Sequence, residues 1–192
     1  MSLTLETQEK QKPIILIYGN NPLISLLLEE YSKEFKIAYV GDLEINEKRE
    51  DFYAIPKSNA KWVKNLEEKI DYTVIFLSGK EDKSLIPSFI EKASNDATRA
   101  AIIIDVESLK DFYDVLLEYK NIPSLKFMFL GDVYSEKPYF NTGSYVYKII
   151  QRAVTSRLIT ISQDVEPVFP IYYKDAVSGI NQILSDRIYY LF

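Results

Sequence analysis

The stretch at residues 14–34 restricts the fold of this chain more than any other feature of its sequence. An apolar run at 14–18 ends at Gly19 and two asparagines, after which leucines recur at helical spacing among charged residues. Asn21 suits a helix N-cap, and Pro22 suits the first helical position, where a backbone N–H is not needed. The pattern predicts a strand, a tight turn and a helix, and α/β proteins bind phosphate at such a helix N-terminus.

The composition of the chain limits the chemistry that it can perform. With 192 residues, of which 47% are hydrophobic, it can bury one sizeable core, so a single domain is expected. The sequence contains no Cys and no His, which excludes disulfides, thiolate or imidazole metal sites and His-based triads. The net charge of −5, without a local cluster of Lys and Arg, argues against nucleic acid as a partner.

No apolar run in the sequence is long enough to cross a bilayer, and the polar N-terminus lacks the core of a signal peptide. We therefore expect a cytoplasmic protein that has no membrane contact within this chain. Residues 1–11 are expected to be a flexible lead-in. The chain stops on an apolar run at 187–192, which favours a piece cut from a longer protein.

Residues 12–192 alternate between β-rich runs and helical patterns. Strands are predicted at 36–41, 52–56, 71–79, 125–130 and 157–162, with an extended segment at 168–173 and the start of another strand at 187–192. Helices are predicted at 85–93, 141–153 and 175–184, and at a helical face formed by Ala60, Val63, Leu66 and Ile70. This alternation predicts right-handed βαβ units. The expected fold class is therefore α/β, a three-layer Rossmann-like domain with a mostly parallel sheet.

Residues 97–119 fit two interpretations. Apolar residues from Ala97 to Tyr119 fall on one stripe of a long helix, whereas the β-branched triple at 102–104 favours a buried strand at 100–105. The helical stripe accounts for more of the segment, so the long helix is the favoured prediction, with the strand left open.

The order of elements and several short strings resemble the NAD-dependent epimerase/dehydratase family, the extended short-chain dehydrogenase/reductases that act on nucleotide sugars, in a shortened form. The strings are the turn at 19–25, the acidic residue Asp42, the segment 125–134 and the segment 169–180. The resemblance implies NAD or NADP as the cofactor. It implies pyrophosphate contacts from Gly19, Asn20, Asn21 and Leu23, with Asp42 on the ribose.

The carboxyl edge of the predicted sheet supplies two further candidate ligand contacts. Ser78 and Gly79 end a predicted strand there, where folds of this kind place their ligands. These two residues could equally lead into a helix, and Gly41-Asp42 could equally be an ordinary turn.

The chain departs from the family pattern at its catalytic positions. Gly19 is the one glycine kept from the family's Gly-x-x-Gly-x-x-Gly, and Leu130-Gly131 replaces a pair of hydroxyl residues. Of the motif Tyr-x-x-x-Lys, Lys148 fits, but Ser144 takes the place of the tyrosine. Lys148 is therefore the single residue to which a catalytic role can be carried over, and a solvated helix lysine is the simpler interpretation.

Two hypotheses follow. The first is a dinucleotide-binding relative of the epimerases and dehydratases, with catalysis reduced or lost; an active form would oxidise or epimerise a sugar nucleotide. The second is a non-catalytic scaffold or interaction domain, either of a longer protein or of a homo-oligomer. The sequence leaves open whether the chain is an enzyme.

Overall fold

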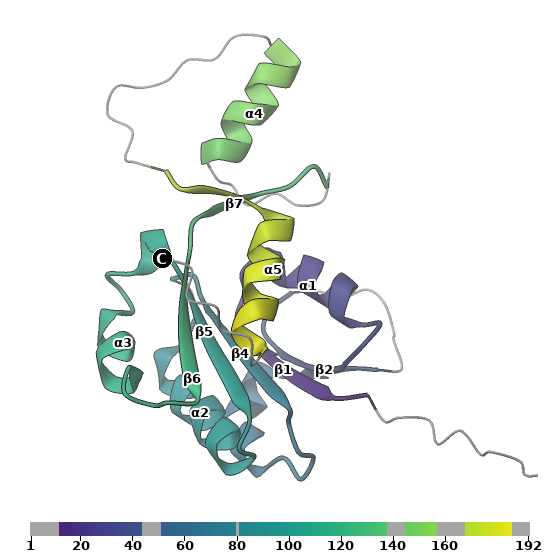
Figure 1. Cartoon of the computed structure of the whole chain (residues 1–192), viewed down its shortest axis with the longest axis vertical. Helices are drawn as coiled ribbons and strands as arrows, with labels where there is room; N and C mark the ends of the chain where they lie inside the picture. The colour runs from purple at the N-terminus through teal and green to yellow at the C-terminus, as the bar shows by residue number, and fades with distance from the viewer. Residues whose placement is uncertain (1–11, 44–50, 80, 138–144, 157–167, 186–192) are drawn as a thin grey trace, which may run out of the picture.

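A parallel sheet forms the centre of the computed structural model, which describes residues 12–43, 51–79, 81–137, 145–156 and 168–185 (Figure 1). Its six strands lie in the order β3-β2-β1-β4-β5-β6. They comprise β1 (Ile14–Tyr18), β2 (Lys36–Val40), β3 (Phe52–Ile55), β4 (Tyr72–Leu77), β5 (Arg99–Asp105) and β6 (Leu125–Leu130). The order reverses between β1 and β4, which are direct neighbours, and ligands of doubly wound sheets bind at such a point.

Helices cover both faces of this sheet (Figure 1). On one face, α1 (Leu23–Tyr31) and α5 (Tyr173–Leu184) pack against Ile15 and Ile17 of β1. On the other face, Leu16 and Tyr18 share a core with the 3₁₀ helix η1 (Lys57–Asn65), α2 (Ile86–Asn95) and α3 (Tyr113–Tyr119). Two short 3₁₀ turns, η2 (Lys83–Leu85) and η3 (Val106–Ser108), follow β4 and β5. The alternation of β1 side chains between the two cores produces the three-layer α/β architecture that was predicted.

A second, two-stranded parallel sheet lies beyond the end of β6. It pairs β7 (Asp132–Tyr134) with β8 (Pro170–Tyr172). Helix α4 (Tyr145–Ser156) packs against β7 and stands away from the main sheet in Figure 1. All twelve residues of α4 are at least partly exposed.

The predicted long helix over 97–119 is wrong. Residues 99–105 form β5, which pairs with β4 and β6, and the helix that follows is confined to α3. The reason is burial on both faces: Ile102 and Ile104 point into one core, and Ile103 points into the other. A strand buried on both sides has a continuous apolar sequence and lacks the alternation that marks an exposed strand.

Other predicted elements are correct in kind but differ in extent. The face formed by Ala60, Val63, Leu66 and Ile70 belongs partly to η1, a 3₁₀ helix that ends at Asn65. Helix α2, helix α5 and the extended segment β8 are confirmed. The flexible lead-in at 1–11, the strand at 157–162 and the apolar end at 187–192 lie outside the described residues.

Candidate functional site

The turn between β1 and α1 lies directly against β4. Gly19 has a φ of +127°, and a Cβ at this position would lie 2.7 Å from the carbonyl oxygen of Phe76. Because of this angle and this distance, any residue with a side chain would strain the backbone here. The one glycine that the turn retains is therefore required by the close approach of two strands.

The start of α1 depends on Asn21, as its position in the sequence predicts. The Oδ1 atom of this buried residue accepts a hydrogen bond of 2.8 Å from the backbone N–H of Leu23, the first helical residue. Pro22 takes helical angles immediately before it, with a φ of −54° and a ψ of −28°. Asn21 thus satisfies one of the helix's terminal N–H groups, in the way that side chains cap helices.

A carboxylate from the loop after β4 lies against this turn. Glu81 is buried, and its Oε1 accepts a hydrogen bond of 3.0 Å from the backbone N–H of Asn20. Its Oε2 accepts from the Ser78 backbone at 2.6 Å, and its Oε1 also accepts from the Ser78 hydroxyl at 3.0 Å. A negative charge therefore lies at the N-terminal end of α1, where the helix dipole favours it.

A second acidic side chain closes the same edge at the end of β5. Both carboxylate oxygens of Asp105 accept hydrogen bonds from Asn21 Nδ2, at 3.0 and 3.1 Å. Burial raises the pKa of Asp105 to about 7, and the negative charge of Glu81 adds to the effect. Further negative charge at this edge would therefore be disfavoured.

Asp42, which the family resemblance assigns to the ribose, lies beside the turn, but its carboxylate already has a partner. Its backbone N–H donates to Asn20 Oδ1 at 2.7 Å, and its carboxylate forms an exposed ion pair with Lys57. The hydroxyl of Tyr39 donates to the carbonyl of Gly19 at 2.9 Å, which fixes the turn to β2.

The remaining predicted residues have different environments. Ser78 is bound to Glu81, and Gly79 has a φ of +90°, where a Cβ would lie 3.1 Å from the Ser108 hydroxyl oxygen. The side chain of Leu23 is fully buried. Lys148 is exposed on α4, and among the described residues no contact joins it to the turn. The structure thus brings Gly19, Asn20, Asn21, Asp42 and Ser78 to one edge of the sheet, without Lys148.

The end of β6 is covered by the chain itself. Leu130 is buried in the core that contains α1 and α5. A Cβ at Gly131 would meet the carbonyl oxygen of Phe169, and the same oxygen accepts a hydrogen bond of 2.8 Å from Asp132 N–H. Apolar groups and backbone therefore fill the position that the family resemblance assigns to a hydroxyl pair. Ser144, at the tyrosine position of the family motif, lies outside the described residues.

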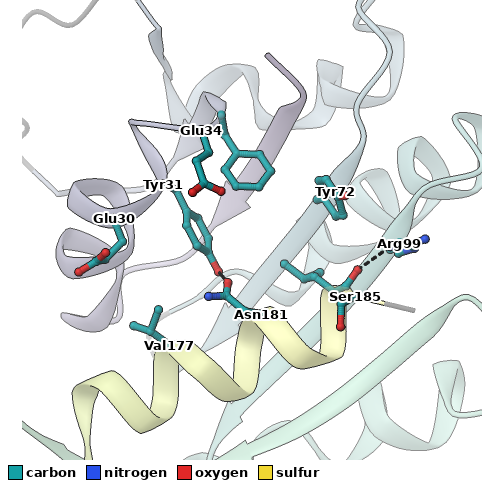
Figure 2. A pocket seen from close by; sticks show the side chains of 10 residues that line it. Glu30, Tyr31, Glu34, Tyr72, Arg99, Val177, Asn181 and Ser185 are labelled. Atoms are coloured by element: carbon teal, nitrogen blue, oxygen red, sulfur yellow. Dashed lines mark hydrogen bonds between the residues drawn. The ribbon is translucent and has the colours of Figure 1, made fainter. Parts of the chain in front are cut away.

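A separate pocket opens at the opposite edge of the sheet, near the start of β4 and β5. It has a volume of about 460 Å³ and lies between α1 and α5 (Figure 2). The Tyr31 hydroxyl donates to Asn181 Oδ1 at 2.5 Å across it, and Arg99 donates to the carbonyl of Leu184 at 3.0 Å. None of the residues predicted to bind a ligand lines this pocket.

Glu81 and Asp105 are the residues that sequence reasoning missed. Glu81 follows a predicted strand end within three residues of Ser78, so an acidic residue at a strand terminus was the available signal. Asp105 was assigned to a helix, which concealed that it ends a strand. Within the described ranges, no helix could span a membrane, and no group of three or more acidic residues could hold a metal ion.

No protein-family model and no curated protein sequence matches the chain. Among solved structures, it is similar to the UDP-N-acetylglucosamine 4-epimerase from Methanobrevibacter ruminantium M1 in complex with UDP-N-acetylmuramic acid. The TM-score is 0.64 at 12% identity, over 92% of this chain and 74% of that one. A Rossmann-fold NAD(P)-binding family protein from Shigella flexneri gives a TM-score of 0.54 at 13% identity, over 90% of this chain and 87% of that one.

CapF, solved with the inhibitor 3-isopropenyl-tropolone, gives a TM-score of 0.50 at 14% identity, over 88% of this chain and 45% of CapF. At such identities the likeness concerns the fold. The chain has an α/β Rossmann-like fold, which it shares with these structures.

Proposed function

We propose that this chain is a non-catalytic Rossmann domain of the epimerase/dehydratase type, which acts as a scaffold or interaction domain in a longer protein or a homo-oligomer. The observation that carries the proposal is the end of β6, where Leu130 is buried and the carbonyl of Phe169 covers Gly131. No side-chain hydroxyl extends from these two positions to hold a substrate oxygen.

The loss of a catalytic base supports the same proposal. A tyrosine base works when a neighbouring lysine ammonium stabilises its ionised form. In this chain the lysine position is kept as Lys148, but the tyrosine position holds Ser144. Proton removal from a sugar hydroxyl therefore has no agent in the motif.

The exposed apolar side chains of α4 support an interaction role. Ile150 and Val154 lie four residues apart on this helix and are 42% and 77% exposed. Phe129 on the edge strand β6 and Phe169 before β8 are also exposed. Exposed apolar residues grouped on one helix are typical of surfaces that contact another protein.

A second candidate function is dinucleotide binding without turnover. It is supported by Asp42, which lies beside the β1–α1 turn, and by the fold shared with an NAD(P)-binding protein. In this candidate, residues 19–23 would hold the pyrophosphate of NAD or NADP, Asp42 would hold the ribose, and a nucleotide sugar would be the substrate class of its active relatives. In either case we expect the protein to act in the cytoplasm.

The turn fits this second candidate poorly. The N–H of Asn20 is one of the groups that would face a pyrophosphate, and it already donates to Glu81. The Asp42 carboxylate pairs with Lys57. We therefore rank dinucleotide binding below the non-catalytic scaffold.

The test is a calorimetric titration of the chain with NAD⁺, NADH, NADP⁺ and NADPH, together with a turnover assay on UDP-N-acetylglucosamine. We expect neither reduced nicotinamide nor an epimerised sugar. Saturable cofactor binding that is lost in Asp42→Ala, without turnover, would establish the second candidate. Turnover that is lost in Lys148→Ala would overturn the proposal and make the chain an enzyme.

A further inference from the structure

We infer that Glu81 supplies the anion of the β1–α1 turn, so that a side chain of this protein stands where a dinucleotide pyrophosphate lies in other proteins of this fold. The inference deepens the proposed function and rests on it in one respect, that the domain works without a cofactor. It goes further by naming Glu81 as the residue that keeps a dinucleotide from the β1–α1 turn.

The position of the carboxylate is the first argument. Backbone N–H groups of the first turn and the positive end of the helix dipole make this location attractive to an anion. Glu81 Oε1 lies 3.0 Å from the N–H nitrogen of Asn20, immediately after Gly19. Its exposed fraction is 7%, so the carboxylate is largely removed from solvent, and the Asn20 N–H and the two Ser78 donors compensate for the lost water.

The second argument is that the surrounding contacts hold the Glu81 loop in place. The Tyr18 hydroxyl accepts a hydrogen bond of 3.1 Å from Asp82 N–H and donates one of 3.2 Å to the Asp82 carbonyl. Both Ser78 donors bind the Glu81 carboxylate from the other side. The last residue of β1 and the first residue after β4 thus fix the loop next to the turn.

The third argument is charge. A pyrophosphate placed at the turn would come close to Glu81 and to Asp105, which binds the neighbouring Asn21. Like charges at short range in a partly buried site repel strongly, because the local dielectric constant is low. A further anion at this edge is therefore disfavoured, and the carboxylate of Glu81 already occupies the turn.

The experiment compares the thermal unfolding of wild type, Glu81→Ala and Glu81→Gln in increasing concentrations of inorganic pyrophosphate and of NAD⁺. Glu30→Ala is the matched control, because Glu30 is an exposed glutamate near the far end of α1. We expect Glu81→Ala to melt at a lower temperature than wild type. Saturating pyrophosphate should raise its Tm by about 3 °C or more beyond any rise in wild type and Glu30→Ala, because a ligand that binds only the folded state stabilises it.

The Glu81→Gln variant keeps the size of the side chain and removes its charge. It should gain pyrophosphate binding in calorimetry, but less than Glu81→Ala because its carboxamide still lies at the turn, and it replaces Glu81→Ala if that variant does not fold. The inference is overturned if neither variant responds to pyrophosphate more than wild type does. It is also overturned if wild type binds NAD⁺ as tightly as the variants. The pyrophosphate response of the variants tests the role of Glu81 alone, so its failure is distinguishable from failure of the proposed function, which is decided by cofactor binding and turnover in wild type.

Discussion

The two acidic residues at the carboxyl edge of the sheet, the buried Glu81 and the partly buried Asp105, interact differently. Glu81 accepts from backbone N–H groups and a hydroxyl, whereas Asp105 accepts from the single amide of Asn21. Fewer donors leave the desolvation of Asp105 less compensated, and its pKa rises to about 7. Asp105 is therefore a residue through which the free energy of unfolding should respond to pH.

Replacing Asp105 by Asn should flatten the dependence of stability on pH. Because the pKa is raised from 3.8 to about 7 on folding, the folded state binds the proton more tightly, and this contribution is fully present below about pH 4. It is lost as the pH rises towards 7. The asparagine of the Asp105→Asn variant cannot ionise, so above pH 7 the free energy of unfolding of the variant should exceed that of wild type by about 1 kcal/mol or more.

Urea unfolding of both proteins between pH 4 and pH 8 measures this effect. At pH 4 Asp105 is protonated in the folded state and about half ionised in the unfolded state, whose pKa is 3.8, so the two curves should lie close together there. A difference between the proteins that stays constant across the range would contradict the assignment.

Gly19→Ala tests the close approach of the turn to β4. Its φ of +127° and the 2.7 Å to the Phe76 oxygen both oppose a Cβ, so the free energy of unfolding should fall by about 2 to 4 kcal/mol. Gly179→Ala is the control. Gly179 lies inside α5, where helix propensity favours alanine, and a Cβ there would meet only the flexible end of the Met128 side chain from β6. Equal losses in the two variants, measured by urea unfolding, would contradict the account.

At the scale of elements, the sequence is most informative where the apolar pattern has a period. Helix α1 and helix α5 each bury one stripe, and both were predicted close to their observed positions. Strand β5 buries both faces, so its pattern has no period that separates a strand from a helix. The long helix was wrongly predicted over 97–119 because β5 is buried on both of its faces.

The candidate site shows the same division between local and long-range information. Gly19 and Asn21 were predicted because a turn and a helix cap have local signatures, and Asp42 was predicted from the family resemblance. The contact between Glu81 and Asn20 joins residues 61 positions apart, and no local pattern indicates it. Only the strand order, which makes β1 and β4 neighbours, brings the two together.

A buried ion pair joins α2 to the segment before β4. Lys92 is 3% exposed, binds Asp96 at 3.0 Å and donates to the Leu66 carbonyl at 2.6 Å, while Asp96 also accepts from Ile70 N–H at 2.8 Å. Asp96→Ala leaves a buried ammonium and a buried N–H without this carboxylate, so stability should fall by about 3 kcal/mol.

The control for this pair is the exposed ion pair of Lys64 and Glu91, which joins η1 to α2. Because solvent screens it, Glu91→Ala should lower stability by less than about 1 kcal/mol in the same unfolding measurement. Comparable losses in the two variants would show that burial is not what distinguishes the pairs.

On the scale of the whole molecule, hydrogen bonds link neighbouring elements at both the carboxyl and the amino edge of the main sheet. In the described part of the chain, helix α4 contributes no residue to either of the two hydrophobic cores. Asn20 and Glu81 connect β1 to the loop after β4 at the carboxyl edge, and Tyr31 and Asn181 connect α1 to α5 near the amino edge. Helix α4 is held through β7, where Val146 N–H donates to Asp132 at 3.2 Å. The body of the domain should therefore unfold as one unit, with α4 contributing little to its stability.

Hydrogen exchange can separate α4 from that body, because α5 offers a helix of the same length. Both contain twelve residues, but α5 buries five of them, including Ala176 and Ile180, whereas every residue of α4 is at least partly exposed. Amides of α4 should exchange at least about tenfold faster than those of α5 in dilute protein, since opening α4 exposes little additional apolar surface. If α4 is the interaction surface that we propose, its exchange should slow when a partner or a second copy covers Ile150 and Val154. Protection of α4 equal to that of α5 at every protein concentration would show that the helix is already covered within one chain, and would remove α4 as support for the interaction role.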